Sequence, residues 1–334
     1  MKSQSAETIT FTKEFTRQEP IPDAGIKRAL ELMKSGRLHR YNTAAGEISE
    51  VSLLEKEYAD YVGARYCLGL SSCGSSIYVA LKSVGVVSGD KILCNVFTLA
   101  PVPGAIENAG AVPVFVEITE DYLTDLEDLE NKASQSGAKY FLLSHMRGHI
   151  VDMDRVSEIC SRLGISLIED CAHTVGCRWG GKYTGTFGRA GCYSSQTYKH
   201  MNSGEGGLLV TDEEDVIAKA ILFSGSYMFY ERHISRPPLE VFERYKNQIP
   251  NFSLRMSNLV AALIRPQLAD LNRQCRRWNR RYDLIEAELS AIGHIHVPSR
   301  SPQEGYVGSS LQFTLSGIDF QDVEAFIETC AERG

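Results

Sequence analysis

The stretch that decides the fold is an apolar run ending in two carboxylates: residues 164–170 read Gly-Ile-Ser-Leu-Ile-Glu-Asp. A short apolar run bounded by turn residues predicts a buried strand. Open α/β sheets bind ligands at the carboxyl ends of their strands, so Glu169 and Asp170 are expected at a ligand-binding edge. Taken alone, the pair is explained at least as well by a loop that simply begins after the strand.

Strand-like runs alternate with helical patterns over the first 200 residues, which predicts βαβ units and a largely parallel sheet. The expected strands are 66–70, 91–95, 112–118, 140–144, 166–168 and 208–211. Beyond about residue 213 the pattern becomes helical, with long helices expected at 257–271 and 276–291. Pro266 should kink or divide the first of these. A strand at 309–315 and a helix at 320–331 indicate a smaller α/β domain.

Composition excludes several classes of protein. A net charge of -7 and a pI near 5.7 argue against a nucleic-acid partner. No apolar stretch approaches the ~20 residues of a membrane span, and residues 1–15 have no signal-peptide core. The nine cysteines stand singly, without metal-ligand spacing, so neither a metal site nor a disulfide framework is expected. A reducing cytoplasm fits this pattern best.

A single lysine, Lys199, lies in a segment rich in hydroxyl residues and glycine, residues 191–207. The default for any lysine is a solvated surface position. Glycines, however, allow a backbone to approach a ligand closely. A lysine with a depressed pKa can form a Schiff base, which is the chemistry that pyridoxal 5'-phosphate (PLP) uses. The segment therefore favours a PLP-binding lysine.

The turn at 71–76 precedes a helix expected to begin near Ser75, with apolar residues at helical spacing from Ile77 to Val84. Helix N-termini offer unpaired N–H groups and a positive dipole end, which suit a phosphate. An ordinary serine N-cap explains the turn equally well.

Together these segments resemble the DegT/DnrJ/EryC1/StrS aminotransferases, fold type I PLP enzymes that act mainly on nucleotide-linked keto sugars. The resemblance covers about residues 20–272, and its motifs occur in order at 36–41, 110–115, 169–173, 185–188, 199–207 and 255–257. It implies the α/β PLP-transferase fold type I. A large domain (20–235) would hold a mainly parallel seven-stranded sheet between helices. A smaller C-terminal α/β domain (236–334) would be shortened relative to the family.

The resemblance implies roles for three catalytic residues. Lys199 would form the Schiff base with PLP and, once freed by substrate, move the proton. Asp170 would pair with the pyridinium nitrogen. His173 would lie beside the phenolic oxygen.

Further positions are implied as binding residues. The phosphate would bind Ser194 and the backbone N–H groups of Gly74 and Ser75, although Cys73-Gly74 stands where the family usually has Gly-Thr. The other cofactor-binding candidates are Phe97, which would stack on the ring, and Gln196.

Two segments are candidates for contacts beyond the cofactor. Asn251, Ser253 and Arg255 match the part that reaches a neighbouring subunit's phosphate, which implies a homodimer, although Ser253 replaces a useful amide. His145 and Arg147 lie in a segment richer in cationic and imidazole groups than the family pattern, and they are candidates for substrate choice. His145 is equally well explained as a supporting group that does not touch substrate.

The implied activity is transfer of an amino group, from glutamate in most of the family, to a keto sugar or sugar-like ketone in biosynthesis. The cycle would be ping-pong, through pyridoxamine phosphate, with the amino donor and keto acceptor as small-molecule partners. One alternative is another PLP reaction on the same scaffold, such as elimination, dehydration or an aromatising step. A PLP-binding sensor or non-catalytic partner is the other. Lys199 favours transamination, because the family's dehydratase branch has histidine there.

Overall fold

A seven-stranded sheet lies at the centre of the computed structural model, which describes residues 10–14 and 17–333. No signal peptide is predicted in residues 1–15, and most of these residues lie outside the described part of the chain. The strand order is β1 (Tyr66–Leu70), β9 (Gly207–Thr211), β8 (Ala190–Ser194), β5 (Ser166–Asp170), β4 (Tyr140–Ser144), β2 (Lys91–Asn95) and β3 (Val112–Val116). Only β9 runs antiparallel to its neighbours within this sheet. The predicted α/β fold with a mainly parallel sheet is confirmed.

Helices cover both faces of the sheet, so its central strands are buried on both sides and read as continuous apolar runs. One face packs against α3 (Cys73–Val84), α4 (Pro101–Asn108) and α7 (Glu214–Ser224). The other face packs against α2 (Glu50–Val62), α5 (Leu126–Ser136), α6 (Met153–Leu163) and the first half of α9 (Asn258–Ser290). This layering leaves the carboxyl ends of β1, β5 and β8 together at one edge, where a ligand can approach.

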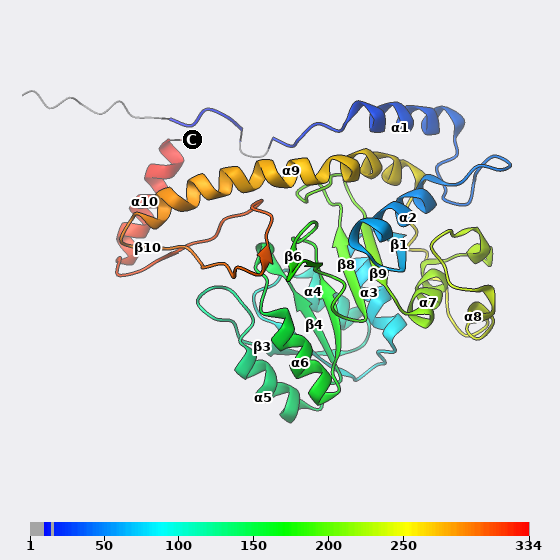
Figure 1. Cartoon of the computed structure of the whole chain (residues 1–334), viewed down its shortest axis with the longest axis horizontal. Helices are drawn as coiled ribbons and strands as arrows, with labels where there is room; N and C mark the ends of the chain where they lie inside the picture. Colours follow the sequence, from blue (N-terminus) through cyan, green and yellow to red (C-terminus); the bar gives the residue numbers. More distant parts are fainter. Residues whose placement is uncertain (1–9, 15–16, 334) are drawn as a thin grey trace, which may run out of the picture.

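Helix α9 corrects the prediction of two helices in this region. It is one helix of 33 residues with Pro266 inside it, and it runs along the top of the molecule in Figure 1 with α1 (Asp23–Ser35) beside it. Proline cannot bond the carbonyl four residues back, here that of Ala262. Packing compensates, because α1 brings Gly25 so close that a Cβ there would lie 3.1 Å from Pro266 Cγ and 3.3 Å from the Ala262 oxygen.

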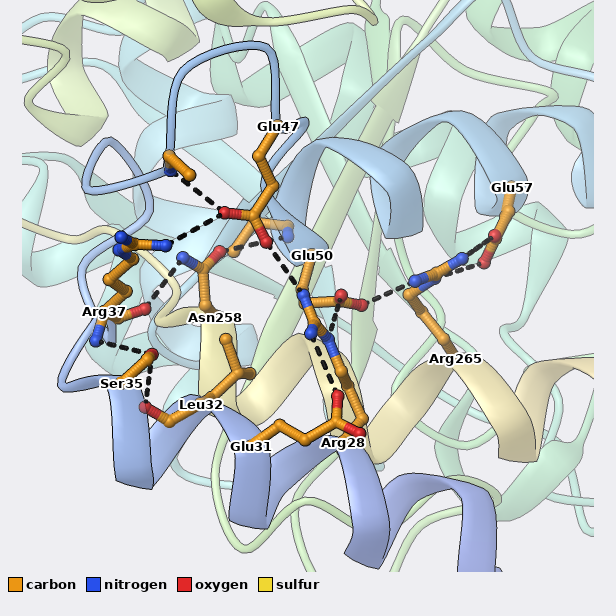
Figure 2. A network of polar contacts seen from close by, with 12 residues as sticks. Arg28, Glu31, Leu32, Ser35, Arg37, Glu47, Glu50, Glu57, Asn258 and Arg265 are labelled. Atoms are coloured by element: carbon orange, nitrogen blue, oxygen red, sulfur yellow. Dashed lines mark hydrogen bonds and ion pairs between the residues drawn. The ribbon is translucent and has the colours of Figure 1, made fainter.

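A network of ion pairs connects α1 and α9 to α2 (Figure 2). Glu50, at the start of α2, accepts from Arg28 Nε of α1 at 2.6 Å and from Arg265 Nη1 of α9 at 2.5 Å. Arg28 also bonds Glu47, and Arg265 also bonds Glu57. The nearby carboxylates raise the pKa of both guanidiniums, so all three helices share one charged anchor.

The C-terminal region contains less strand than predicted. Within 309–315 only Thr314–Leu315 (β12) is a strand, and it pairs with Ile295–His296 (β10). Helix α10 (Phe320–Glu332) agrees with its prediction. Glu304–Gly305 (β11) adds to a small sheet with Arg178–Trp179 (β6) and Lys182–Tyr183 (β7).

The boundary at residue 236 stays a prediction. Helix α8 (Leu239–Glu243) lies just beyond it, and its Val241 and Phe242 belong to the main core. Among residues 10–14 and 17–333, none of the helices combines the length and apolar character required to span a membrane.

Candidate active site

The turn after β1 places a helix N-terminus at the edge of the sheet. Helix α3 begins at Cys73, two residues earlier than predicted, with Ser72 as N-cap accepting from the Ser75 N–H at 3.0 Å. The Ser75 hydroxyl is held by Ser72 Oγ at 2.9 Å and Ser71 Oγ at 3.0 Å. The N–H of Gly74 lies in the first turn, so it has no acceptor within the helix. The backbone here is suited to an anion.

Asp170 ends β5 with its carboxylate turned toward this turn. Oδ2 accepts from Ser144 Oγ at 2.8 Å, while Oδ1 accepts from the Ala172 N–H at 3.1 Å and lies 3.8 Å from Cys73 Sγ. Asp170 is 5% exposed, and among the described residues no cationic side chain lies within ion-pair distance of it. A buried carboxylate with only hydroxyl, amide and thiol donors leaves room for a ligand's N–H⁺.

Glu169 points to the opposite face of the strand, as the two-residue period requires. Its oxygens accept from the N–H groups of Gly185, Phe187 and Gly188 at 2.7–2.9 Å and contact His145 Nε2 at 3.2 Å. The ligand atoms of His145, Glu169 and Cys171 lie within 4.8 Å of one another, close enough for a metal ion. The four hydrogen bonds on Glu169 instead make it the anchor of the loop before β8.

Lys199 and His173 meet beside Asp170. Lys199 Nζ lies 2.8 Å from His173 Nε2. Burial lowers the pKa of Lys199, against the opposing charge of Asp170. Burial, with the charges of Lys199 and Arg147, lowers the pKa of His173 to about 3. The imidazole is therefore neutral at physiological pH, and its Nε2 accepts from the Lys199 amine.

The loop between β8 and β9 fixes the register of Lys199. Backbone bonds join Ser195 N–H to the Gly206 carbonyl at 3.0 Å and Thr197 N–H to the Gly204 carbonyl at 3.1 Å. His200, the next residue along, points elsewhere: its Nδ1 donates to the Val175 carbonyl at 2.7 Å and its Nε2 accepts from Ser309 Oγ at 2.6 Å. Lys199 rather than His200 thus reaches the site.

These elements enclose a cavity of about 580 Å³, a size typical of small-molecule sites. It brings together seven of the predicted site residues: Gly74, Arg147, Asp170, His173, Ser194, Gln196 and Lys199. Most of them come from loops that follow the carboxyl ends of β1, β4, β5 and β8.

Sequence comparison now identifies the family. The profile of the DegT/DnrJ/EryC1/StrS aminotransferase family matches residues 24–334. The chain belongs to this family. The predicted resemblance is confirmed.

Individual relatives and solved structures agree with this membership. A GDP-perosamine synthase from Escherichia coli O157:H7 is 26% identical over 75% of this chain and 66% of its own. An L-glutamine:2-deoxy-scyllo-inosose aminotransferase from Streptomyces kanamyceticus is 30% identical over 84% of this chain and 66% of its own. The crystal structure of a 3-amino-5-hydroxybenzoic acid synthase superposes with a TM-score of 0.82, at 26% identity, over 96% of this chain and 80% of its own. The chain spans between about half and two thirds of the length of the first curated relatives.

Six predicted site residues do not line the cavity: His145, Phe97, Ser75 and the three partner-subunit candidates Asn251, Ser253 and Arg255. The side chain of His145 is fully buried against Glu169, which favours the alternative of a supporting group that does not touch substrate. Phe97 packs against Tyr122 at a centroid distance of 5.1 Å, and its stacking role stays a prediction. Ser75 instead lines a neighbouring hollow with Phe252 and Leu254.

The three candidates for contact with a partner subunit form hydrogen bonds within their own chain; they are Asn251, Ser253 and Arg255. Asn251 Oδ1 accepts from the Ser253 N–H at 2.8 Å, and Arg255 Nη1 donates to the Gly225 carbonyl at 2.9 Å. Leu254 between them accepts from the Ser71 N–H at 2.9 Å, so the segment lies beside the turn at 71–76. Their contact with a second subunit stays a prediction.

Sequence reasoning missed Ser144, which donates to Asp170. The signal was present: Ser144 ends β4, and it is the register partner of Asp170 on the adjacent parallel strand. Polar residues that end neighbouring parallel strands meet at the same edge of the sheet.

Proposed function

We propose that this chain is a PLP-dependent aminotransferase acting on a keto sugar or sugar-like ketone. The observation that carries the proposal is the one cavity shared by Lys199, His173 and the buried carboxylate of Asp170, which has no ion-pair partner among the described residues. Family membership and relatives named for amino-sugar and inosose chemistry support the same class of substrate.

The donor set fits PLP. Asp170 would hold the pyridinium nitrogen, since no other cation neutralises it among the described residues. The N-terminus of α3 at Gly74, together with Ser194 and the Gln196 side of the cavity, would hold the phosphate. PLP, when bound, supplies an electron sink for bonds to the substrate's α-carbon.

Lys199 is placed to hold and move a proton. Burial favours its neutral amine, which is the form that can act as nucleophile or base. Neutral His173 accepts a hydrogen bond from Nζ at 2.8 Å and so orients the amine toward the cavity. We infer that His173 is a positioning residue for Lys199.

We further propose glutamate as the amino donor, a ping-pong cycle, a homodimer and a cytoplasmic location. The first three rest on the resemblance to the family. The location rests on nine cysteines that are all unpaired. The Asn251–Arg255 segment would contribute to the partner's site.

The test is the absorption spectrum of the protein purified with PLP. We expect a visible band that is lost when glutamate is added. In the protein without glutamate, borohydride should bleach this band and leave the cofactor covalently attached to Lys199. Lys199→Ala should show neither, while Lys56→Ala, on the exposed side of α2, should behave as wild type. A protein that stays colourless with PLP, or a band that no amino donor changes, would overturn the proposal.

An aromatising or eliminating reaction is the second candidate. It is favoured by the likeness to the solved 3-amino-5-hydroxybenzoic acid synthase. Product analysis separates the two: transamination of glutamate yields 2-oxoglutarate in equal amount to the aminated product, whereas elimination yields none.

A further inference from the structure

Arg147 occupies an unusual backbone position at the rim of the cavity. It follows β4 within a short 3-10 segment (Met146–Gly148), with φ 57° and ψ 15°. This left-handed conformation is disfavoured for residues that carry a Cβ. Because residues in strained backbone conformations cluster at functional sites, the side chain of Arg147 is a candidate for a functional contact.

The guanidinium of Arg147 has no hydrogen-bond or ion-pair partner among residues 10–14 and 17–333. Other arginines near the sheet are paired, such as Arg189 with Glu213 at 2.6 Å and Arg40 with Glu55 at 2.8 Å. The fork of Arg147 is therefore available to a ligand.

Arg147 separates two cavities. It lines the cofactor cavity, and it also lines a second cavity of about 370 Å³ that is closed by residues 17–22 and α9. The two share one wall, made of Arg147, Ala172, His173, Tyr198 and Lys199. A molecule in the second cavity would thus meet Lys199 and Arg147 together.

The second cavity favours an anion. Its two acidic groups, Glu19 and Asp270, are already paired with Arg277 and Arg273. On the shared wall, the Arg147 guanidinium remains as a cation without an acidic partner among the described residues. The charge of Arg147 also acts to lower the pKa of both Lys199 and His173, which places it electrostatically close to them.

We propose that Arg147 binds the α-carboxylate of the amino donor. This inference rests on the proposed function, because an α-amino acid carries its amino and carboxylate groups on one carbon. Arg147 lines the same wall as Lys199, so it is available to the carboxylate of a donor whose nitrogen is at Lys199. The planar guanidinium fork matches a carboxylate with two parallel hydrogen bonds.

The experiment uses the PLP-loaded protein and three ligands: the 2-methyl analogues of L-glutamate, L-glutamine and L-isoglutamine. They have no α-proton to lose, so calorimetric titration measures binding without turnover. L-Isoglutamine lacks only the α-carboxylate, and L-glutamine lacks only the side-chain carboxylate. We expect wild type to bind the glutamate analogue about 10- to 100-fold more tightly than the isoglutamine analogue, as expected for a charge-assisted bidentate pair.

Arg147→Gln should abolish this discrimination, and Arg147→Lys should restore part of it. Arg155→Gln, at an exposed position of α6, is the matched control and should keep it. Arg147→Gly, which removes the backbone strain, should fold at least as stably as wild type and still lose the discrimination.

Two results would overturn the inference. One is an Arg147→Gln protein that still binds the glutamate analogue more tightly than the isoglutamine analogue. The other is an Arg147→Gln protein that instead loses only the preference over the glutamine analogue, which would assign Arg147 to the side-chain carboxylate. If wild type binds none of the three and its spectrum ignores glutamate, the proposed function itself fails.

Discussion

Two neighbouring carboxylates of one strand do different work because they face opposite sides of the sheet. Glu169 is fully buried, and its oxygens accept hydrogen bonds from three backbone N–H groups and contact His145 Nε2. Asp170 lies beside the helix N-terminus and Lys199, and no side chain of the described residues forms an ion pair with it. The sequence pair alone could not distinguish a loop opening from a ligand site; in the structure Glu169 binds the loop amides, whereas Asp170 lines the cavity.

Substitution of these two residues should therefore separate stability from cofactor binding. Glu169→Gln leaves part of the loop's amide array without a charged acceptor and should lower the free energy of unfolding by about 1–3 kcal/mol. Asp170→Asn keeps the shape but loses the charge, so stability without cofactor should change little while PLP affinity falls at least about tenfold. Denaturant titration and PLP titration measure the two quantities. Equal effects of both changes on PLP affinity would contradict this division.

Helices far apart in sequence are joined by one buried carboxylate. The side chain of Glu50 is 5% exposed and receives Arg28 and Arg265, whereas that of Glu57, which also receives Arg265, is 40% exposed. Coulomb interactions are screened less in buried positions, so the two contacts on Arg265 should differ in strength.

We accordingly expect Glu50→Gln to lower the free energy of unfolding by about 1–3 kcal/mol, because it leaves two guanidiniums without their shared partner. Glu57→Gln, the matched control on the same helix, should cost less than about 1 kcal/mol, as exposed pairs do. Chemical denaturation of both variants gives the comparison. A loss at Glu57 as large as that at Glu50 would show that burial does not govern this anchor.

Elements could be predicted from the sequence where local pattern and packing agree. The predicted strands at 66–70, 91–95 and 140–144 have the observed bounds, and those at 112–118, 166–168 and 208–211 are within two residues, since apolar runs between turn residues are sufficient evidence. The central strand β8 was not predicted, because its small and polar residues form no apolar run. The prediction of two helices around Pro266 was wrong. Proline disfavours a helix locally, but packing against Gly25 and the ion pairs of Glu50 stabilise α9 as one helix. The backbone turn at Arg147 and the burial of His145 depend on the loop's three-dimensional path, which no periodicity reveals.

At the scale of the whole molecule, a buried polar network joins segments nearly 200 residues apart. Arg40 donates to Glu55 at 2.8 and 2.9 Å and to His233 Nδ1 at 3.1 Å, and Tyr41 lies 2.7 Å from His233 Nε2. Burial acts to raise the pKa of Glu55, but the Arg40 guanidinium outweighs it, and that pKa is held at about 2. Burial and Arg40 lower the pKa of His233 to about 4. The network thus contains one cation, one anion and a neutral imidazole.

This network makes stability depend on acid pH. The pKa of His233 is lowered on folding, from an ordinary value of about 6.5, so the unfolded chain binds the extra proton first. Stability from His233 is complete above about pH 6.5 and falls as the pH drops toward 4, by up to about 1.4 kcal/mol per pH unit. The difference in the free energy of unfolding between wild type and His233→Gln should therefore narrow by about 2 kcal/mol between pH 7 and pH 5, as measured by denaturant unfolding. Between pH 7 and 8 that difference should be constant, and a gap that stays the same down to pH 5 would mean that His233 is not neutral in the folded protein.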